Sequence, residues 1–218
     1  MSFNLSADIY AQQFGSFIIA VLGLIHFTKR EKPILILGFY GLNDVLFEVI
    51  NLNTDFKDNI VGDVYTLVEA LILLYFFYTL FSSSRLKKIT IILSIIYCVL
   101  YLFLITGDSP ERFGTIRMLR DLLVISCSLL YFYFLMIHMP TVAITHYPMF
   151  WIVAAFIFFF AGTFVLSLSL DYLINVLKDD MRYLWPARNY FRFFFCLVVS
   201  YGLWLDLRLV KMKQPIQH

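Results

Sequence analysis

Acidic and basic side chains stand inside stretches of this sequence that are otherwise apolar, and these residue types can bind ions or transfer protons. Residues 40–53, YGLNDVLFEVINLN, hold Asn43, Asp44 and Glu48. In the hydrocarbon of a membrane, an ionised carboxylate costs at least about 2.5 kcal/mol, so buried acids usually mark a functional site. The charged residues within or at the ends of apolar stretches are Asp44, Glu48, Asp63, Glu69, Asp121 and Asp171, with Arg117, Arg120, Arg188 and Arg192.

A spacing of three or four residues places these side chains on common helix faces. Tyr40, Asp44 and Glu48 share one face, and Tyr65 and Glu69 share another. Later stretches repeat the pattern, with faces formed by Arg117, Arg120, Asp121 and Ser128, by Thr163, Ser167, Asp171 and Asn175, and by Arg188, Asn189, Arg192 and Cys196. Lipid would leave each exposed polar group unpaired at a cost of several kcal/mol. The polar faces must therefore turn toward one another.

We predict that these faces enclose a pocket that opens to the outer surface and binds a small polar or zwitterionic ligand. The predicted ligand-binding residues are Tyr40, Asn43, Asp44, Glu48, Tyr65, Glu69, Arg120, Asp121, Asp171, Arg188, Asn189 and Arg192. Arg120 and Arg192 are expected to hold an anionic group, because guanidinium is always charged and forked. Asp44 and Glu69 are expected to meet a cationic group or a proton. Because acids outnumber arginines, either some carboxyl groups stay protonated or a cation completes the balance.

Two other interpretations of the same residues stay open. Asp44 with Glu69, or Glu48 with Asp121, could act as an acid and a base in a membrane-embedded hydrolase that cleaves a lipid. The ion pairs could also hold the bundle together in a structural subunit of a membrane complex. Binding without catalysis is the preferred interpretation. The inner halves of the stretches hold few polar residues, which favours sensing through a partner over transport.

The elements that must position these residues are membrane-spanning helices. The chain has 218 residues, is 61% hydrophobic and has a mean hydropathy of +0.81. A water-soluble domain is usually about 45–50% apolar, whereas a span needs about 20 mostly apolar residues. We expect an all-α, seven-transmembrane-helix bundle that forms a single domain over residues 1–218. The predicted spans cover residues 9–28, 33–51, 60–81, 89–107, 116–139, 148–176 and 186–207.

Basic residues in the short loops predict the orientation of this bundle. Cytoplasmic loops carry an excess of lysine and arginine. On one side lie Lys29, Arg30, Lys32, Arg85, Lys87, Lys88, Arg208, Lys211 and Lys213, and on the other lie mostly acids, among them Asp55, Asp58, Asp108, Glu111, Asp179 and Asp180. The N-terminus is therefore expected outside and the C-terminus in the cytoplasm. The expected location is the inner (plasma) membrane of a bacterium.

Composition also bounds the partners and cofactors. His26, His138 and His146 fall at the cytoplasmic side, away from the acids, so neither a metal nor another cofactor is expected. The small net charge of +2 is explained by topology and does not favour nucleic acid. Residues 89–107 carry no charge, which favours contact with lipid or a partner, although a parallel repeat of helices 1–3 and 5–7 stays open. The expected partners are the lipid bilayer, the ligand, a partner membrane or signalling protein, and a second copy in a homo-oligomer.

Overall fold

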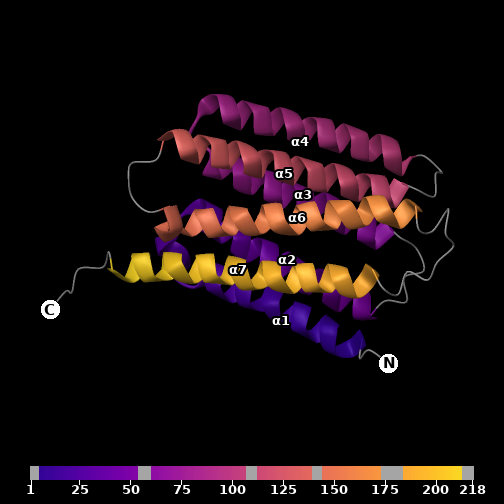
Figure 1. The fold of residues 1–218 in the computed structure, drawn as a ribbon, viewed down its shortest axis with the longest axis horizontal. Coiled ribbons are helices and arrows are strands. Elements are labelled where there is room, and N and C mark those ends of the chain that lie inside the picture. Colours follow the sequence, from indigo (N-terminus) through magenta and orange to yellow (C-terminus); the bar gives the residue numbers. More distant parts are fainter. Residues whose placement is uncertain (1–4, 54–59, 107–111, 139–143, 173–183, 213–218) are drawn as a thin grey trace.

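The computed structural model describes residues 5–53, 60–106, 112–138, 144–172 and 184–212. Within these ranges the chain forms seven α-helices and two short 3₁₀ helices, with no strand, as the predicted all-α class requires. The elements are α1 (Leu5–Leu24), η1 (Phe27–Lys29), α2 (Lys32–Asn53), α3 (Ile60–Leu80), α4 (Ser84–Ile105), α5 (Arg112–His138), η2 (Ile144–His146), α6 (Pro148–Tyr172) and α7 (Leu184–Met212). The helices run side by side along the long axis of the molecule (Figure 1).

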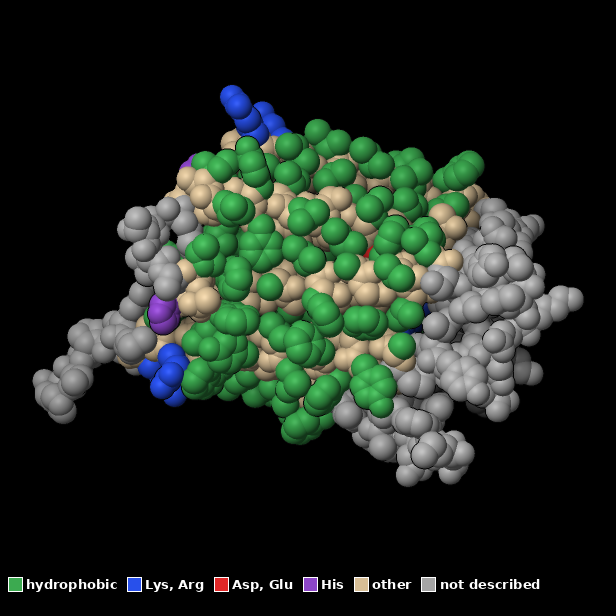
Figure 2. Space-filling model, viewed as in Figure 1, with side chains coloured by type: hydrophobic (Ala, Val, Ile, Leu, Met, Phe, Trp, Pro, Cys, Tyr) green, Lys and Arg blue, Asp and Glu red, His purple; other side chains and the backbone are tan. Residues whose placement is uncertain are grey.

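The exposed surface of the bundle indicates a polytopic membrane protein. In the part of the chain that the structure describes, six helices, α2 to α7, are long and apolar enough to span a bilayer, and α1 contributes a shorter apolar run, Gln13–Leu24. Large apolar side chains such as Phe103 and Met136 are 74% and 77% exposed. A belt of apolar side chains covers the visible face, and the visible lysines and arginines gather at one end (Figure 2). That end, which holds the start of α4 and the end of α7, is called the basic end below.

The first helix ends before the predicted first span, residues 9–28, does. The helix α1 ends at Leu24, and His26 adopts a left-handed conformation with φ of 60° before η1 begins. The side chain of Arg30 donates hydrogen bonds to the carbonyl oxygens of Leu22 (2.9 Å) and Ile25 (3.3 Å). These bonds satisfy two acceptors that a helix end leaves open, so the turn is stabilised by a residue that follows it.

Small residues allow α1 and α2 to approach each other closely. A Cβ atom added to Gly23 would lie 2.6 Å from the Cα atom of Gly38, and one added to Gly41 would lie 2.8 Å from the carbonyl oxygen of Ser16. Such contacts between backbones are typical of membrane helices with small residues at their interface. They bring the Ser16 side of α1 against the part of α2 that carries the predicted site.

A layer of phenylalanines fills the middle of the bundle. This aromatic layer consists of Phe76, Phe77, Phe156, Phe159 and Phe195, none of which is more than 2% exposed. Ring centroids within the layer lie 5.0 Å apart for Phe159 and Phe195, 5.4 Å for Phe76 and Phe156, and 5.5 Å for Phe156 and Phe195. Aromatic pairs at such distances add to the free energy of burial alone. The layer joins α3, α6 and α7.

The helix α4 lies at the edge of the bundle, against α3 and α5 (Figure 1). Its buried side chains are Thr90, Tyr97 and Tyr101. Apolar residues such as Ile95 and Phe103 are exposed on its outer face. This placement agrees with the expectation that the uncharged stretch faces lipid or a partner.

Candidate functional site

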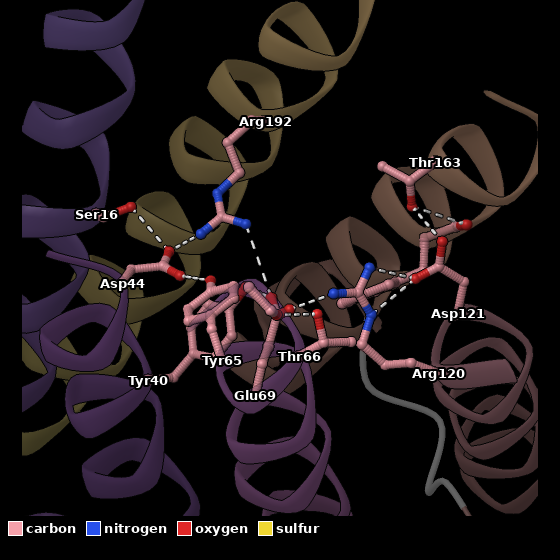
Figure 3. Close-up of polar contacts among 12 residues, drawn as sticks. Ser16, Tyr40, Asp44, Tyr65, Thr66, Glu69, Arg120, Asp121, Thr163 and Arg192 are labelled. Atoms are coloured by element: carbon pink, nitrogen blue, oxygen red, sulfur yellow. Dashed lines mark hydrogen bonds and ion pairs between the residues drawn. The ribbon is translucent and has the colours of Figure 1, made fainter. Parts of the chain in front are cut away.

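Five charged side chains from α2, α3, α5 and α7 form a chain of alternating charge in the interior. This charged cluster runs from Asp44 to Arg192, Glu69, Arg120 and Asp121 (Figure 3). None of the five residues is more than 7% exposed. The prediction that acids of the second and third helices approach arginines of the fifth and seventh is therefore met in the arrangement of these side chains.

Arg192 bridges the acids of two different helices. Its guanidinium group is ion-paired with the Asp44 carboxylate, and its Nη1 atom lies 3.8 Å from Oε1 of Glu69. The same group lies over the rings of Phe159 and Phe195, at 5.3 Å and 5.8 Å from their centroids. A guanidinium held over aromatic faces and shielded from water gains cation–π attraction in addition to its ion pairs. The aromatic layer is thus also one wall of the site.

Arg120 connects the second half of the chain. Its Nη1 atom donates to Oε2 of Glu69, while its Nε and Nη2 atoms donate to Oδ1 of Asp121 at 2.9 Å and 2.6 Å. Its guanidinium group lies 5.4 Å from the ring centroid of Phe160. Arg120 and Asp121 are neighbours in the sequence, so α5 alone supplies one complete ion pair. The Nη1 atom of Arg120 is left to donate to Glu69 of α3.

Each carboxylate of the cluster also accepts a hydrogen bond from a hydroxyl group. A charge-assisted hydrogen bond of this kind contributes about 1.5–3 kcal/mol, and it fixes the direction of the carboxylate. The donors and acceptors are Ser16 Oγ to Asp44 Oδ2 (3.0 Å), Tyr65 Oη to Asp44 Oδ1, Tyr40 Oη to Glu69 Oε1 (3.0 Å) and Thr163 Oγ1 to Asp121 Oδ2 (2.9 Å). Together with the charged residues, these hydroxyls bring six helices, α1 to α3 and α5 to α7, to one site.

The two tyrosines exchange partners between α2 and α3. Tyr40 stands four residues before Asp44 on α2, and Tyr65 stands four residues before Glu69 on α3. Each tyrosine donates to the acid on the other helix. Tyr65 is held in place by stacking on Phe47, with ring centroids 4.0 Å apart. The fourfold spacing therefore supplies two reciprocal bonds between helices.

The other predicted site residues lie outside this chain of contacts. Glu48 is half-buried and within electrostatic range of Arg188 on α7, which is half-buried as well. Asn189 is half-buried on the same helix. Asn43 buries its Nδ2 atom, which has no hydrogen-bond partner within the described ranges. The side chain of Asp171 lies outside the described residues.

Sequence reasoning missed the aromatic part of the site. Phenylalanines in FIFFFAG and RFFFC are usually lipid-facing or core residues, yet Phe159, Phe160 and Phe195 lie against the two arginines of the cluster. Their spacing carried the signal, because Phe195 stands three residues after Arg192 and Phe160 three residues before Thr163. Thr163 lay on a predicted polar face, but neither Thr163 nor Ser16 was among the predicted ligand-binding residues.

The close contacts of the cluster determine what it can do chemically. It can bind an additional positive charge at its carboxylates, or pass a proton among carboxylates and hydroxyls once an ion pair opens. The five side chains contact one another directly. The water-accessible pocket predicted between the charged faces stays a prediction. Among the described residues, no three His, Cys, Asp or Glu side chains gather in a way that could hold a metal ion.

Comparison of the chain with models of protein families, with curated proteins and with solved structures gave no match.

Proposed function

We propose that the charged cluster binds a small solute that carries a positive charge, either a cation or a zwitterion, for sensing through a partner protein or for transport. The charge balance supports this proposal most directly. Three carboxylates meet two guanidinium groups, and all five side chains are buried. A charge buried without compensation is unfavourable by several kcal/mol. The direct contacts therefore leave one carboxylate charge to be balanced by a bound cation, by a proton or by Arg117, which lies within electrostatic range of Glu69 and Asp121.

Acidic residues also outnumber basic residues by one when the neighbouring charged residues are counted. The described acids of this half of the bundle are Asp44, Glu48, Asp63, Glu69 and Asp121, and the described arginines are Arg117, Arg120, Arg188 and Arg192. Acids still exceed bases by one in this set. Asp44 and Glu69 are the preferred points of attachment for the added charge, because both face Arg192 and accept a tyrosine hydroxyl. A cationic ligand would either displace Arg192 or share the carboxylate groups of Asp44 and Glu69 with it.

The proposal includes an orientation for the protein. The protein is placed in a bacterial inner membrane, with the N-terminus outside and the C-terminus in the cytoplasm. In this arrangement α1 spans the membrane as well as α2 to α7, which makes seven spans in all. Support comes from the described lysines of the basic end, Lys29, Lys32, Lys87, Lys88 and Lys211. In this orientation, solutes reach the charged cluster from the outer side.

A structural role is the second candidate, and one observation favours it. The hydrogen bonds and ion pairs of the cluster connect six helices, so the same contacts could serve only to hold the bundle together. In that case the cluster would need no solute. Each acid of the cluster is paired directly with a guanidinium group, which favours binding or structure over the paired acid and base that a hydrolase requires.

The experiment that tests solute binding compares Asp44→Asn and Glu69→Gln with wild type, all purified in an uncharged detergent. Methylammonium is the probe cation, glycine the probe zwitterion and acetate the probe anion, and the apparent melting temperature is measured at rising probe concentration. Binding to the folded state raises this temperature in a saturable way. Methylammonium and glycine should do so in wild type, and acetate should not. Lys88→Gln, which removes an exposed charge of α4 remote from the cluster, is the matched control and should respond like wild type.

Two outcomes would contradict the proposal. One is a wild type that responds to none of the positively charged probes. The other is a response of equal size in Asp44→Asn and Glu69→Gln. Loss of folding in both variants, together with a wild type that ignores every probe, would support the structural role.

A further inference from the structure

A second polar site lies at the basic end of the bundle, remote from the charged cluster. A cavity of about 540 Å³ lies there. It is formed by the segment that connects η1 to α2 and by the ends of α3, α5, α6 and α7. Its lining includes Lys29, Glu31, Tyr131, Met149 and Asp206. The volume lies within the range of about 300–1,000 Å³ that is usual for small-molecule sites. The cavity is too large for a bare ion and is lined by both charged and apolar groups.

The aromatic layer separates this cavity from the charged cluster, as the order of residues along two helices demonstrates. On α3, Glu69 of the cluster precedes Phe76 of the aromatic layer, and Leu80 lines the cavity. On α7, Arg192 of the cluster precedes Phe195, and Asp206 lines the cavity. With a rise of about 1.5 Å per residue, the two sites lie roughly 15–20 Å apart along the helices.

A buried ion pair fixes the wall of the cavity. Arg30 is ion-paired with Asp206 of α7, and the Arg30 side chain is 0% exposed. The same guanidinium group caps carbonyl oxygens of Leu22 and Ile25. Because one side chain holds both the end of α1 and the end of α7, the neighbouring Lys29 and Glu31 are kept at the mouth of the cavity. The opposite charges at the mouth are thus held by the fold itself.

We propose that this cavity binds a zwitterionic molecule with an apolar body. Glu31 and Asp206 face the cationic group of the ligand, and Lys29 faces its anionic group. The apolar body lies against Leu80 and Met149, with the ring of Tyr131 beside it. A purely apolar ligand would take these charges out of water without compensation, and a ligand of one charge would match only part of the mouth. This site goes beyond the function proposed for the charged cluster and does not depend on it.

Such a ligand can come from two sources, a single-chain phospholipid or a free zwitterion with an apolar side chain. Lysophosphatidylethanolamine serves as the probe for the first and phenylalanine for the second. Lysophosphatidylglycerol has the same kind of chain without the ammonium group, and it measures binding that does not depend on a zwitterion. Each probe is titrated into the full-length protein in dodecyl maltoside micelles, and the apparent melting temperature gives the apparent affinity.

The variants separate specific binding from partition into the micelle. Lys29→Ala and Glu31→Gln together remove the two exposed charges of the mouth and should weaken zwitterion binding about tenfold. Leu80→Trp fills the cavity and should abolish binding by steric exclusion. Lys88→Ala removes an exposed lysine of α4 at the same end and should change nothing.

The results identify the source of the ligand or overturn the proposal. Stabilisation by lysophosphatidylethanolamine alone assigns the site to a lipid headgroup, and stabilisation by phenylalanine as well assigns it to free zwitterions. Equal effects of lysophosphatidylglycerol and lysophosphatidylethanolamine would overturn the proposal. So would stabilisation that is unchanged in Leu80→Trp and in the double variant, or the absence of stabilisation by every zwitterionic probe.

Discussion

Replacing Arg192 by leucine should destabilise the protein because it removes the bridge between two buried acids. The Nη1 atom of Arg192 lies 3.8 Å from Oε1 of Glu69, and two unit charges at that distance attract each other by about 4 kcal/mol at an effective dielectric constant of 20. The Asp44 carboxylate is closer to the same group. Desolvation offsets part of this attraction, and the loss of one partner of a buried ion pair typically costs about 3–5 kcal/mol. Leucine still packs against Phe159 and Phe195, so the change reports mainly on charge.

The double variant Arg192→Leu, Asp44→Asn should be more stable than Arg192→Leu alone. In the single variant the Asp44 carboxylate stays buried without its cation, whereas asparagine carries no charge, accepts a hydrogen bond at Oδ1 from one neighbouring hydroxyl group and donates one from Nδ2 to the other. For a chain of this size, 1 kcal/mol shifts the melting temperature by about 2–4 °C, so Arg192→Leu should lower it by roughly 6–20 °C.

Thermal unfolding followed by intrinsic fluorescence in dodecyl maltoside measures these shifts. Arg208→Leu is the matched control, because Arg208 is exposed on the same helix and should lower the melting temperature by less than about 2 °C. A double variant that is no more stable than Arg192→Leu would refute the reasoning, since it would mean that the carboxylate is not left uncompensated.

Three further substitutions test other contacts by the same thermal assay. Gly41→Leu places side-chain atoms where the backbone of α1 now lies, 2.7–2.8 Å from the added Cβ, and should cost about 1–3 kcal/mol through overpacking. Asp206→Asn leaves the buried guanidinium of Arg30 without its charged partner and should cost about 3–5 kcal/mol; an unchanged melting temperature would contradict a buried ion pair at the basic end. Thr163→Val removes the 2.9 Å hydrogen bond to Asp121 and should cost about 1.5–3 kcal/mol, which is less than the expected cost of Asp206→Asn.

Hydrophobicity predicts the helices well, because a span is defined by a long apolar run that the sequence displays directly. Each of the seven predicted stretches overlaps one α-helix of the described residues. The boundary at the end of α1 could not be predicted, because residues 25–28 are as compatible with a helix as those before them. The turn there depends on Arg30 reaching back to Leu22 and across to Asp206, and contacts between distant residues are invisible to local patterns.

Periodicity predicts which side chains face the interior but not which atoms meet. Fourfold spacing placed Tyr40 with Asp44 and Tyr65 with Glu69, and these residues do gather in one cluster. The exchange of partners between α2 and α3 depends on the distance and rotation of the two helices, which close backbone contacts such as those of Gly41 help to fix. A single sequence does not contain those distances.

The basic end differs most from expectation for the same reason. Arg30 was assigned to the loop charges that set topology, and it is instead a buried partner of Asp206. A basic residue in a loop and a basic residue in an ion pair look alike in the sequence. The polarity of this end was therefore underestimated from the sequence, because charged groups line a cavity there.

The positions of the two polar sites bear on the choice between sensing and transport. A transporter has to connect a solute site to each side of the membrane in turn, so the buried rings of the aromatic layer would have to separate. A sensor needs only a movement that one site causes at the other. The helix α7 carries Arg192 of the cluster, Phe195 of the layer and Asp206 of the cavity wall. A rigid shift of α7 would therefore change both ion pairs and the layer together.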